Sequence, residues 1–248
     1  MADYKFPTEM VELPSKGHFY FDGHPLSSGK VEVKYMTAKE EDILTSQNLI
    51  QQGTVIDKLL ESLIVDKSIK LDDMLVGDKN AIMVAARILA YGKEYEFTYD
   101  GVEQTVDLSA LEPVELDFSK FTKGKNEFNF KLPNSEREIV FKLLTQKDEK
   151  EIAKEILAKQ KISKEQSSIF TTRLKHMLLS VDGKLEKVYI NNFVDNEFLS
   201  RDSLAFRQNL SLITPDVNMN TKAIDSTGRE TEVAVPITVR FFWPSAGI

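Results

Sequence analysis

One pattern of residues occurs twice along this chain, at a constant offset of 108 positions. Residues 31–41 read VEVKYMTAKEE and residues 139–149 read IVFKLLTQKDE. A Leu-Pro pair lies upstream of each copy, and an aspartate, an alanine and a Gly-x-Glu-x-x-Val segment follow each copy in the same order. Short matches arise by chance, but a shared order of landmarks is typical of an internal duplication. We therefore predict two similar halves, residues 1–122 and residues 123–248, with a boundary near residues 120–126.

Local signals predict the same plan in the first half as in the second. Thr37 and Glu40 have the spacing of a capping box, and aspartate is a good N-cap residue. The expected elements of the first half are a strand over 31–35, a helix capped by Thr37, a helix over 55–65, a helix from Asp78 to Gly92, a hairpin that turns at Asp100-Gly101, and a strand-like piece at Val114–Phe118. A further strand-like piece at 128–130 follows the predicted boundary.

The second half is expected to repeat this order. Its predicted elements are a strand over 137–144, a helix over 146–158 capped by Thr145, a helix from Ser163 to Val181, a helix opened by Asp202, and strands over 216–222, 231–235 and 237–243. Helices that cluster in each half, with small antiparallel sheets around them, define an α+β fold.

Composition excludes several classes of function. With 42% hydrophobic and 29% charged residues, the chain has the make-up of a globular protein. Its net charge of −7 opposes nonspecific attraction to nucleic acid or to anionic membranes. No apolar stretch is long enough to span a membrane, and the N-terminus lacks the apolar core of a signal peptide. The absence of cysteine fits a reducing compartment, so we expect a cytosolic protein that binds neither nucleic acid nor membrane.

Residues that would carry out catalysis are sparse. His18 and His24 flank Asp22, so a metal site of two histidines and one carboxylate can be drawn, although histidines in packing or at a surface are commoner. His176 stands alone in an amphipathic segment, and neither a phosphate-binding loop nor a Gly-x-Ser-x-Gly motif occurs. We therefore expect no catalytic residue, no metal, no cofactor and no small-molecule substrate. The alternative is a metal-dependent hydrolase that uses His18, Asp22, His24 and further acids.

Aromatic side chains near the C-terminus are the best candidates for binding a partner. Residues 239–243 read VRFFW, and side chains alternate across a strand, so Phe241, Phe242 and Trp243 cannot all enter one core. In one interpretation Phe241 and Trp243 are buried and Phe242 is half covered by the same domain. In the other, Phe242 faces a partner, because aromatic residues dominate binding energies at interfaces.

Two further segments allow the same choice. Phe19 and Tyr20 lie in an aromatic run near the N-terminus. The charged stretch 147–164 has a thin apolar stripe that includes Ile152 and Ile156. Such a stretch more often forms a helix with a solvated face. The alternative is an amphipathic helix that binds a partner, with its apolar stripe covered only in the complex.

The order of several motifs resembles the baseplate hub assembly proteins of T-even-type contractile-tailed phages. The motifs are LPSKGHFYF at 13–21, MTAKEEDIL at 36–44, GDKNAIMVAARILAYGKEYEF at 77–97 with VDLSALE after it, and RFFWPS at 240–245. The resemblance spans nearly the whole chain. It implies a hub component or assembly chaperone that contacts other baseplate hub and tail proteins, acts in the host cytoplasm during assembly and is retained in the virion if it is a component.

The chain departs from this family pattern at two hairpins. The resemblance implies Cys-x-x-Cys pairs after the AYG helix and before the terminal FFWP segment. This sequence has Thr98-Tyr99-Asp100-Gly101 and residues 222–228 there, without sulfur. A zinc knuckle is therefore not carried over, and packing of the Asp100-Gly101 turn is expected to replace it.

Overall fold

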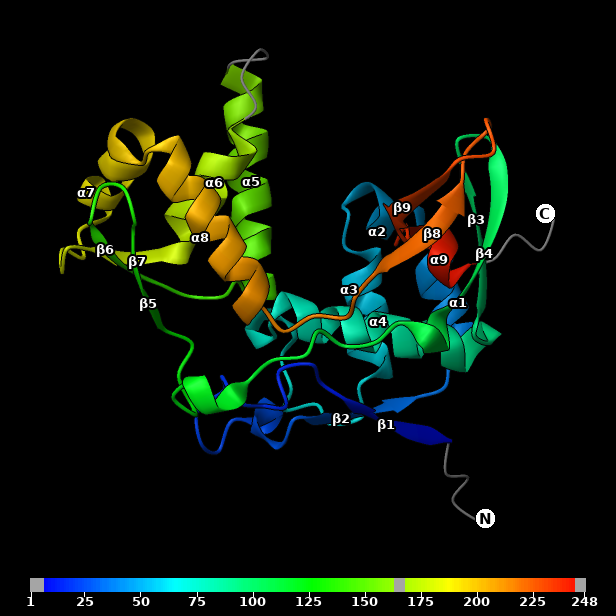
Figure 1. Cartoon of the computed structure of the whole chain (residues 1–248). Helices are drawn as coiled ribbons and strands as arrows, with labels where there is room; N and C mark the ends of the chain where they lie inside the picture. Colours follow the sequence, from blue (N-terminus) through cyan, green and yellow to red (C-terminus); the bar gives the residue numbers. More distant parts are fainter. Residues whose placement is uncertain (1–6, 163–167, 244–248) are drawn as a thin grey trace.

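The computed structural model describes residues 7–162 and 168–243, and its fold is α+β (Figure 1). The strands are β1 (Thr8–Glu12), β2 (Lys30–Lys34), β3 (Glu94–Tyr99), β4 (Val102–Asp107), β5 (Phe128–Lys131), β6 (Glu138–Phe141), β7 (Leu178–Val181), β8 (Asn220–Ile224) and β9 (Glu230–Ala234). The helices are α1 (Ala38–Thr45), α2 (Gln47–Gln51), α3 (Val55–Leu63), α4 (Val76–Tyr91), α5 (Gln146–Ile162), α6 (Ile169–Met177), α7 (Lys187–Asn192), α8 (Ser200–Ile213) and α9 (Val239–Phe242).

The sheets are small and antiparallel. Strands β1 and β2, β3 and β4, and β8 and β9 form two-stranded sheets, while β5, β6 and β7 form a sheet of three. Small sheets cannot bury much apolar surface alone, so the helices supply much of the core. Within the described residues, no helix is both long and apolar enough to cross a membrane.

Two lobes are visible in Figure 1, and the C-terminal segment crosses between them. The second lobe, residues 128–213, contains β5 to β7 and α5 to α8. The first lobe contains β1 to β4 and α1 to α4, and β8, β9 and α9 lie with it. The Tyr95 ring of β3 meets the Phe241 ring of α9 with centroids 4.8 Å apart. The segment after residue 215 therefore packs on the first lobe, although it follows the second lobe in sequence.

The two halves share the order of their elements and several local contacts. The Lys34 ammonium lies 2.8 Å from the Glu40 carboxylate, which also accepts a hydrogen bond from the Thr37 backbone at 2.9 Å. In the second half the corresponding contacts of Asp148 are with Lys142 at 2.6 Å and the Thr145 backbone at 2.9 Å. Both predicted helix starts at 37 and 145 are thus observed. The common origin of the two halves stays a prediction.

In both halves, the residues that follow the Leu-Pro pair donate hydrogen bonds to a buried aspartate. Asp78 accepts hydrogen bonds from the Ser15 amide and hydroxyl, directly after the first Leu-Pro pair. Asp202 accepts hydrogen bonds from the Asn134 and Ser135 amides, directly after the second. The prediction that each aspartate opens its helix is wrong by a short margin, because α4 begins at Val76 and α8 at Ser200. Each aspartate lies in the first turn and fixes a distant loop instead.

Two expected elements in the middle of the chain differ from prediction. Val114–Phe118 is no strand, but Pro113 forms a β-bridge with Val217 and the Val114 amide donates to Asp216. The helix expected from Ser163 to Val181 is α6 followed by β7, and residues 163–167 lie outside the described part of the chain. Strand β7 pairs with β6, which requires an extended backbone.

Candidate functional site

The terminal aromatics are core residues rather than a binding face. Residues 239–242 form the short helix α9, so the expected strand over 237–243 is wrong. Phe241 and Phe242 are both fully buried, which contradicts the outward orientation expected for Phe242, and Trp243 is half-buried. On a helix, adjacent side chains point about 100° apart, so neighbouring rings can enter one core.

The N-terminal aromatic run is likewise mostly internal. Phe19 and Tyr20 are buried, and the Tyr20 hydroxyl donates to Asp78 at 2.6 Å while accepting from the Leu75 amide at 2.9 Å. Burial raises the pKa of Tyr20 well above its ordinary value, so the hydroxyl keeps its proton. Only Phe21 leaves its ring largely in solvent, with 62% exposed. Phe19 and Tyr20 therefore stabilise the first lobe.

The charged stretch forms α5 as far as Ile162, and α5 packs along α6; residues 163 and 164 lie outside the described part of the chain. Ile152 is buried and Ile156 packs against the core, so the predicted stripe is already covered by this chain. Arg173 of α6 forms two hydrogen bonds with Glu149 of α5, at 2.8 and 2.6 Å. Leu157, with 58% exposed, is the large apolar side chain that α5 leaves in solvent among its described positions.

The metal site drawn at the N-terminal turn does not form among the described residues. His18 Nε2 lies 3.1 Å from the Phe121 carbonyl oxygen, and His24 Nδ1 accepts from the Leu26 amide at 3.1 Å. Asp22 is exposed, and it joins no group of ligand atoms with these histidines. The two rings are thus held separately by the backbone.

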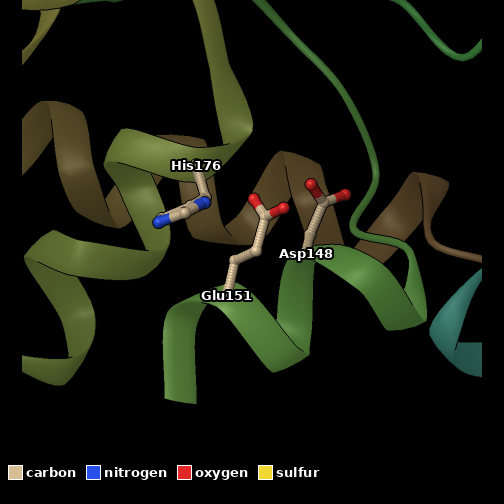
Figure 2. Close-up of side chains that lie close together, drawn as sticks. All are labelled: Asp148, Glu151 and His176. Carbon is tan, nitrogen blue, oxygen red and sulfur yellow. The ribbon is translucent and has the colours of Figure 1, made fainter. Parts of the chain in front are cut away.

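One other group of possible metal ligands lies between α5 and α6. Figure 2 shows Asp148 and Glu151 on α5 facing His176 on α6, with one ligand atom of each within 4.8 Å of the others. Asp148 already bonds Lys142 and Thr145, and His176 Nε2 lies 3.0 Å from Glu155. A divalent cation would compete with the Lys142 ammonium, so we assign Asp148 to capping α5.

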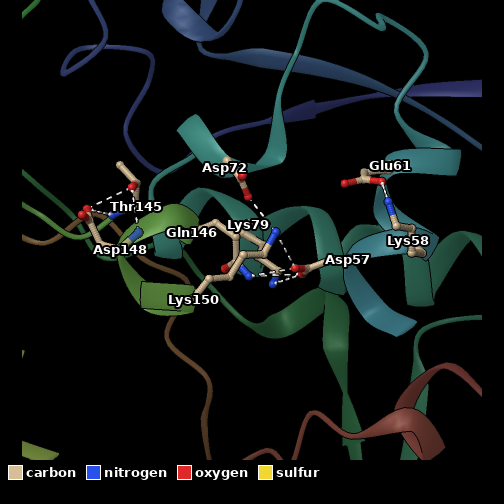
Figure 3. Close-up of polar contacts among 9 residues, drawn as sticks. All are labelled: Asp57, Lys58, Glu61, Asp72, Lys79, Thr145, Gln146, Asp148 and Lys150. Atoms are coloured by element: carbon tan, nitrogen blue, oxygen red, sulfur yellow. Dashed lines mark hydrogen bonds and ion pairs between the residues drawn. The ribbon is translucent and has the colours of Figure 1, made fainter. Parts of the chain in front are cut away.

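An ion-pair cluster around the buried Asp57 carboxylate joins the two lobes, and we call it the Asp57 cluster (Figure 3). Asp57 of α3 accepts from Lys79 of α4 at 2.6 Å and lies 3.0 Å from Lys150 of α5. Gln146 donates to the same carboxylate at 3.2 Å, and Lys150 reaches Asp72 at 2.6 Å. Burial alone would raise the pKa of Asp57, but the hydrogen bonds and charges of Lys79 and Lys150 have the larger effect, so the pKa lies below its ordinary value. Asp57 therefore stays charged and holds the start of α5 against α3 and α4.

The tips of the hairpins β3–β4 and β8–β9 lie together and are joined by hydrogen bonds. The Asp100 carboxylate accepts from the Ser226 amide at 3.0 Å and from the Ser226 hydroxyl. Behind the tips, the Gln104 side-chain amide both donates to and accepts from the Ile224 backbone, at 2.9 and 3.0 Å. These contacts lie in the two hairpins where the family resemblance implies cysteine pairs. Hydrogen bonds hold them here.

A groove of about 710 Å³ follows the outer edge of β3, and we call it the β3 groove. It is lined by residues 94–98 of β3, by Glu103 of β4, by Arg87 and Tyr91 of α4, and by Pro236, Thr238 and Arg240 in the C-terminal segment. Sequence reasoning missed it because its walls are 140 residues apart in the chain; the alternation of acidic and aromatic residues over 94–97 was the available signal.

Comparison of this chain with known proteins gave no match. No protein-family model matches it, and no curated protein and no solved structure matches it either. The likeness to phage baseplate hub assembly proteins is carried by the order of sequence motifs alone.

Proposed function

We propose that this chain is a non-enzymatic protein of the phage tail baseplate hub, which acts through protein–protein contacts as a hub component or assembly chaperone. The observation that carries the proposal is the order of four motifs from residue 13 to residue 245. Its partners are other hub and tail proteins, and its place of action is the host cytoplasm during assembly, with retention in the virion if it is a component.

The roles of the motif residues support a structural protein. Ser15 and Tyr20 of the first motif bind Asp78 of the third, and all three are buried. Phe241 of the last motif packs on Tyr95 of the third. The motifs therefore meet one another in the first lobe and serve its packing.

Exposed apolar side chains on the second lobe support contacts with other proteins. Val188 of α7 is 82% exposed and Leu212 of α8 is 73% exposed. Leu185, Leu199 and Leu204 are also exposed nearby in sequence. Single exposed apolar residues are ordinary, and a partner that buries several of them together would make them a binding surface.

Copurification from phage-infected cells tests the proposal. A tagged chain expressed during infection is expected to bring down baseplate hub proteins, identified by mass spectrometry. Its presence in purified mature particles would identify a hub component, whereas its presence only in assembly intermediates would identify a chaperone. Recovery of no tail protein in either fraction would contradict the proposed function.

A further inference from the structure

The outer edge of β3 carries backbone groups with no hydrogen-bond partner. The hairpin turns at Asp100 and Gly101, and Tyr99 pairs directly with Val102. In such a two-residue hairpin the closing pair is hydrogen-bonded, so the amides and carbonyls of Tyr95, Phe97 and Tyr99 point to β4. The backbone groups of Glu94, Glu96 and Thr98 point away from β4. Among the described residues, those of Glu96 and Thr98 form no hydrogen bond.

The other edge of the same hairpin is covered. Strand β4 faces β8, and the Gln104 side chain completes the contact with the Ile224 backbone. The β3 edge is therefore the one that this hairpin leaves open within the described chain. An open edge is a template for a further strand.

Arg87 already satisfies the first outward carbonyl of β3. It is 4% exposed, and its Nη2 donates to the Glu94 carbonyl at 3.1 Å, while its Nη1 donates to Gly92 at 2.9 Å. The open backbone groups of this edge therefore begin at Glu96.

The side chains beside the open edge are acidic. Glu94 and Glu96 of β3 and Glu103 and Asp107 of β4 belong to the same face of the hairpin, because they lie at alternate positions of paired strands, and all but Asp107 are exposed. Asp107 pairs with Lys93, whereas Glu94, Glu96 and Glu103 form no ion pair within the described residues. Like charges on facing strands repel, so this edge disfavours a second copy of itself and favours basic side chains.

We propose that the outer edge of β3 is a docking site for an extended segment of a partner protein with basic side chains at alternate positions. The segment adds a strand to the sheet and bonds the backbones of Glu96 and Thr98. Its basic side chains lie beside Glu94 and Glu96. The side chains between them face the β3 groove, which is lined by Tyr91, Pro236 and Arg240. The proposal needs only this edge and does not depend on the hub assignment.

A short synthetic peptide in which lysine and valine alternate is the probe. The peptide is expected to shift the amide resonances of Glu96 and Thr98 and to slow their hydrogen exchange. A version with N-methyl groups on alternate amides cannot donate to the β3 backbone, and it is expected to bind at least about tenfold more weakly. A version with glutamate in place of lysine is expected not to bind.

Three variants of the intact chain locate the site. Thr98→Pro removes an outward amide, which an edge strand tolerates, and is expected to weaken binding at least about tenfold. Glu96→Lys is expected to weaken it by a similar factor through repulsion. Glu232→Lys, an exposed change of equal charge on β9, is the control and is expected to leave affinity unchanged. Should Thr98→Pro fail to fold, Glu96→Lys and the N-methylated peptide decide the question.

Several outcomes would overturn the proposal. Equal binding of the N-methylated peptide would show attraction to acidic charge without strand addition. An equal loss in Glu232→Lys and Glu96→Lys would show that only net charge matters. Protection of the Glu96 and Thr98 amides in the protein without peptide, rising with protein concentration, would show that a second copy covers the edge.

Discussion

Asp78 and Asp202 hold the two Leu-Pro turns, but they do so with different donors. Asp78 receives the Ser15 amide, the Ser15 hydroxyl and the Tyr20 hydroxyl, whereas Asp202 receives two backbone amides. Both carboxylates are fully buried. Asp78 thus accepts hydrogen bonds from side chains as well as backbone, whereas Asp202 accepts them from the backbone alone. We therefore expect substitution of Asp78 to destabilise the protein more than substitution of Asp202.

The largest expected effect separates these two aspartates. Asp78→Ala leaves one amide and two hydroxyls without an acceptor in the core, and is expected to lower the free energy of unfolding by about 3–5 kcal/mol. Asp202→Ala leaves two amides and is expected to cost about 2–3 kcal/mol. Urea denaturation of both variants measures the difference. An equal loss of unfolding free energy in the two variants would contradict the proposed difference between the two contacts.

The next effect concerns the start of α4 and α8. A Cβ on Gly77 would lie 1.9 Å from the Pro215 carbonyl oxygen, so Gly77→Ala forces α4 away from the segment that crosses between the lobes. Alanine ordinarily stabilises a helix by about 1 kcal/mol relative to glycine. Here Gly77→Ala is expected to lower the free energy of unfolding by about 1–3 kcal/mol. The matched position in α8 is exposed Arg201, where Arg201→Ala is expected to stay within about 0.5 kcal/mol. Stabilisation by Gly77→Ala in thermal unfolding would contradict the close approach.

A smaller effect is expected from pH. Burial raises the pKa of Glu40, but hydrogen bonds from Lys34, Thr37 and Ser62 outweigh it and lower the pKa from 4.5 to about 2. A lowered folded pKa means that the contribution of Glu40 is complete above about pH 4.5 and is lost as pH falls towards 2. Glu40→Gln is expected to flatten the pH dependence of the unfolding midpoint in that window. Exposed Glu151→Gln is the control, and an equal change in both variants would refute the assignment.

The smallest effect compares the two helix caps. Thr37→Ala and Thr145→Ala are each expected to cost about 1 kcal/mol, because each removes a hydroxyl from the start of α1 or α5. Thr→Ser variants keep the hydroxyl and serve as controls. Urea denaturation checks whether the costs match, and a cost at one cap only would weaken the view of the halves as equivalent.

Local signals in the sequence predicted much of the fold. The helices after Thr37 and Thr145 were predictable because each cap involves a residue only three positions further along the chain. Asp100 and Gly101 adopt positive φ of 47° and 78°, as a tight hairpin requires. The α+β class followed from such signals, since each depends only on neighbours in the chain.

Features that depend on distant residues were not predictable. The aromatic run 241–243 favours a strand, but Phe241 and Phe242 lie on the short helix α9, where both rings are buried and Phe241 packs on Tyr95. The β3 groove needs residues 236–240 beside β3, and no pattern in either segment indicates the other. Contacts between segments far apart in the sequence override local preference at these places.

The C-terminal segment belongs to the core of the first lobe, and native-state hydrogen exchange tests this placement most directly. Phe241→Leu loosens the contact with Tyr95 while it keeps an apolar side chain in place. We expect faster exchange of amides in α4, β3 and β4, with protection in β5 to β7 unchanged. Faster exchange confined to residues 128–213, with α4 and β3 unaffected, would contradict this placement.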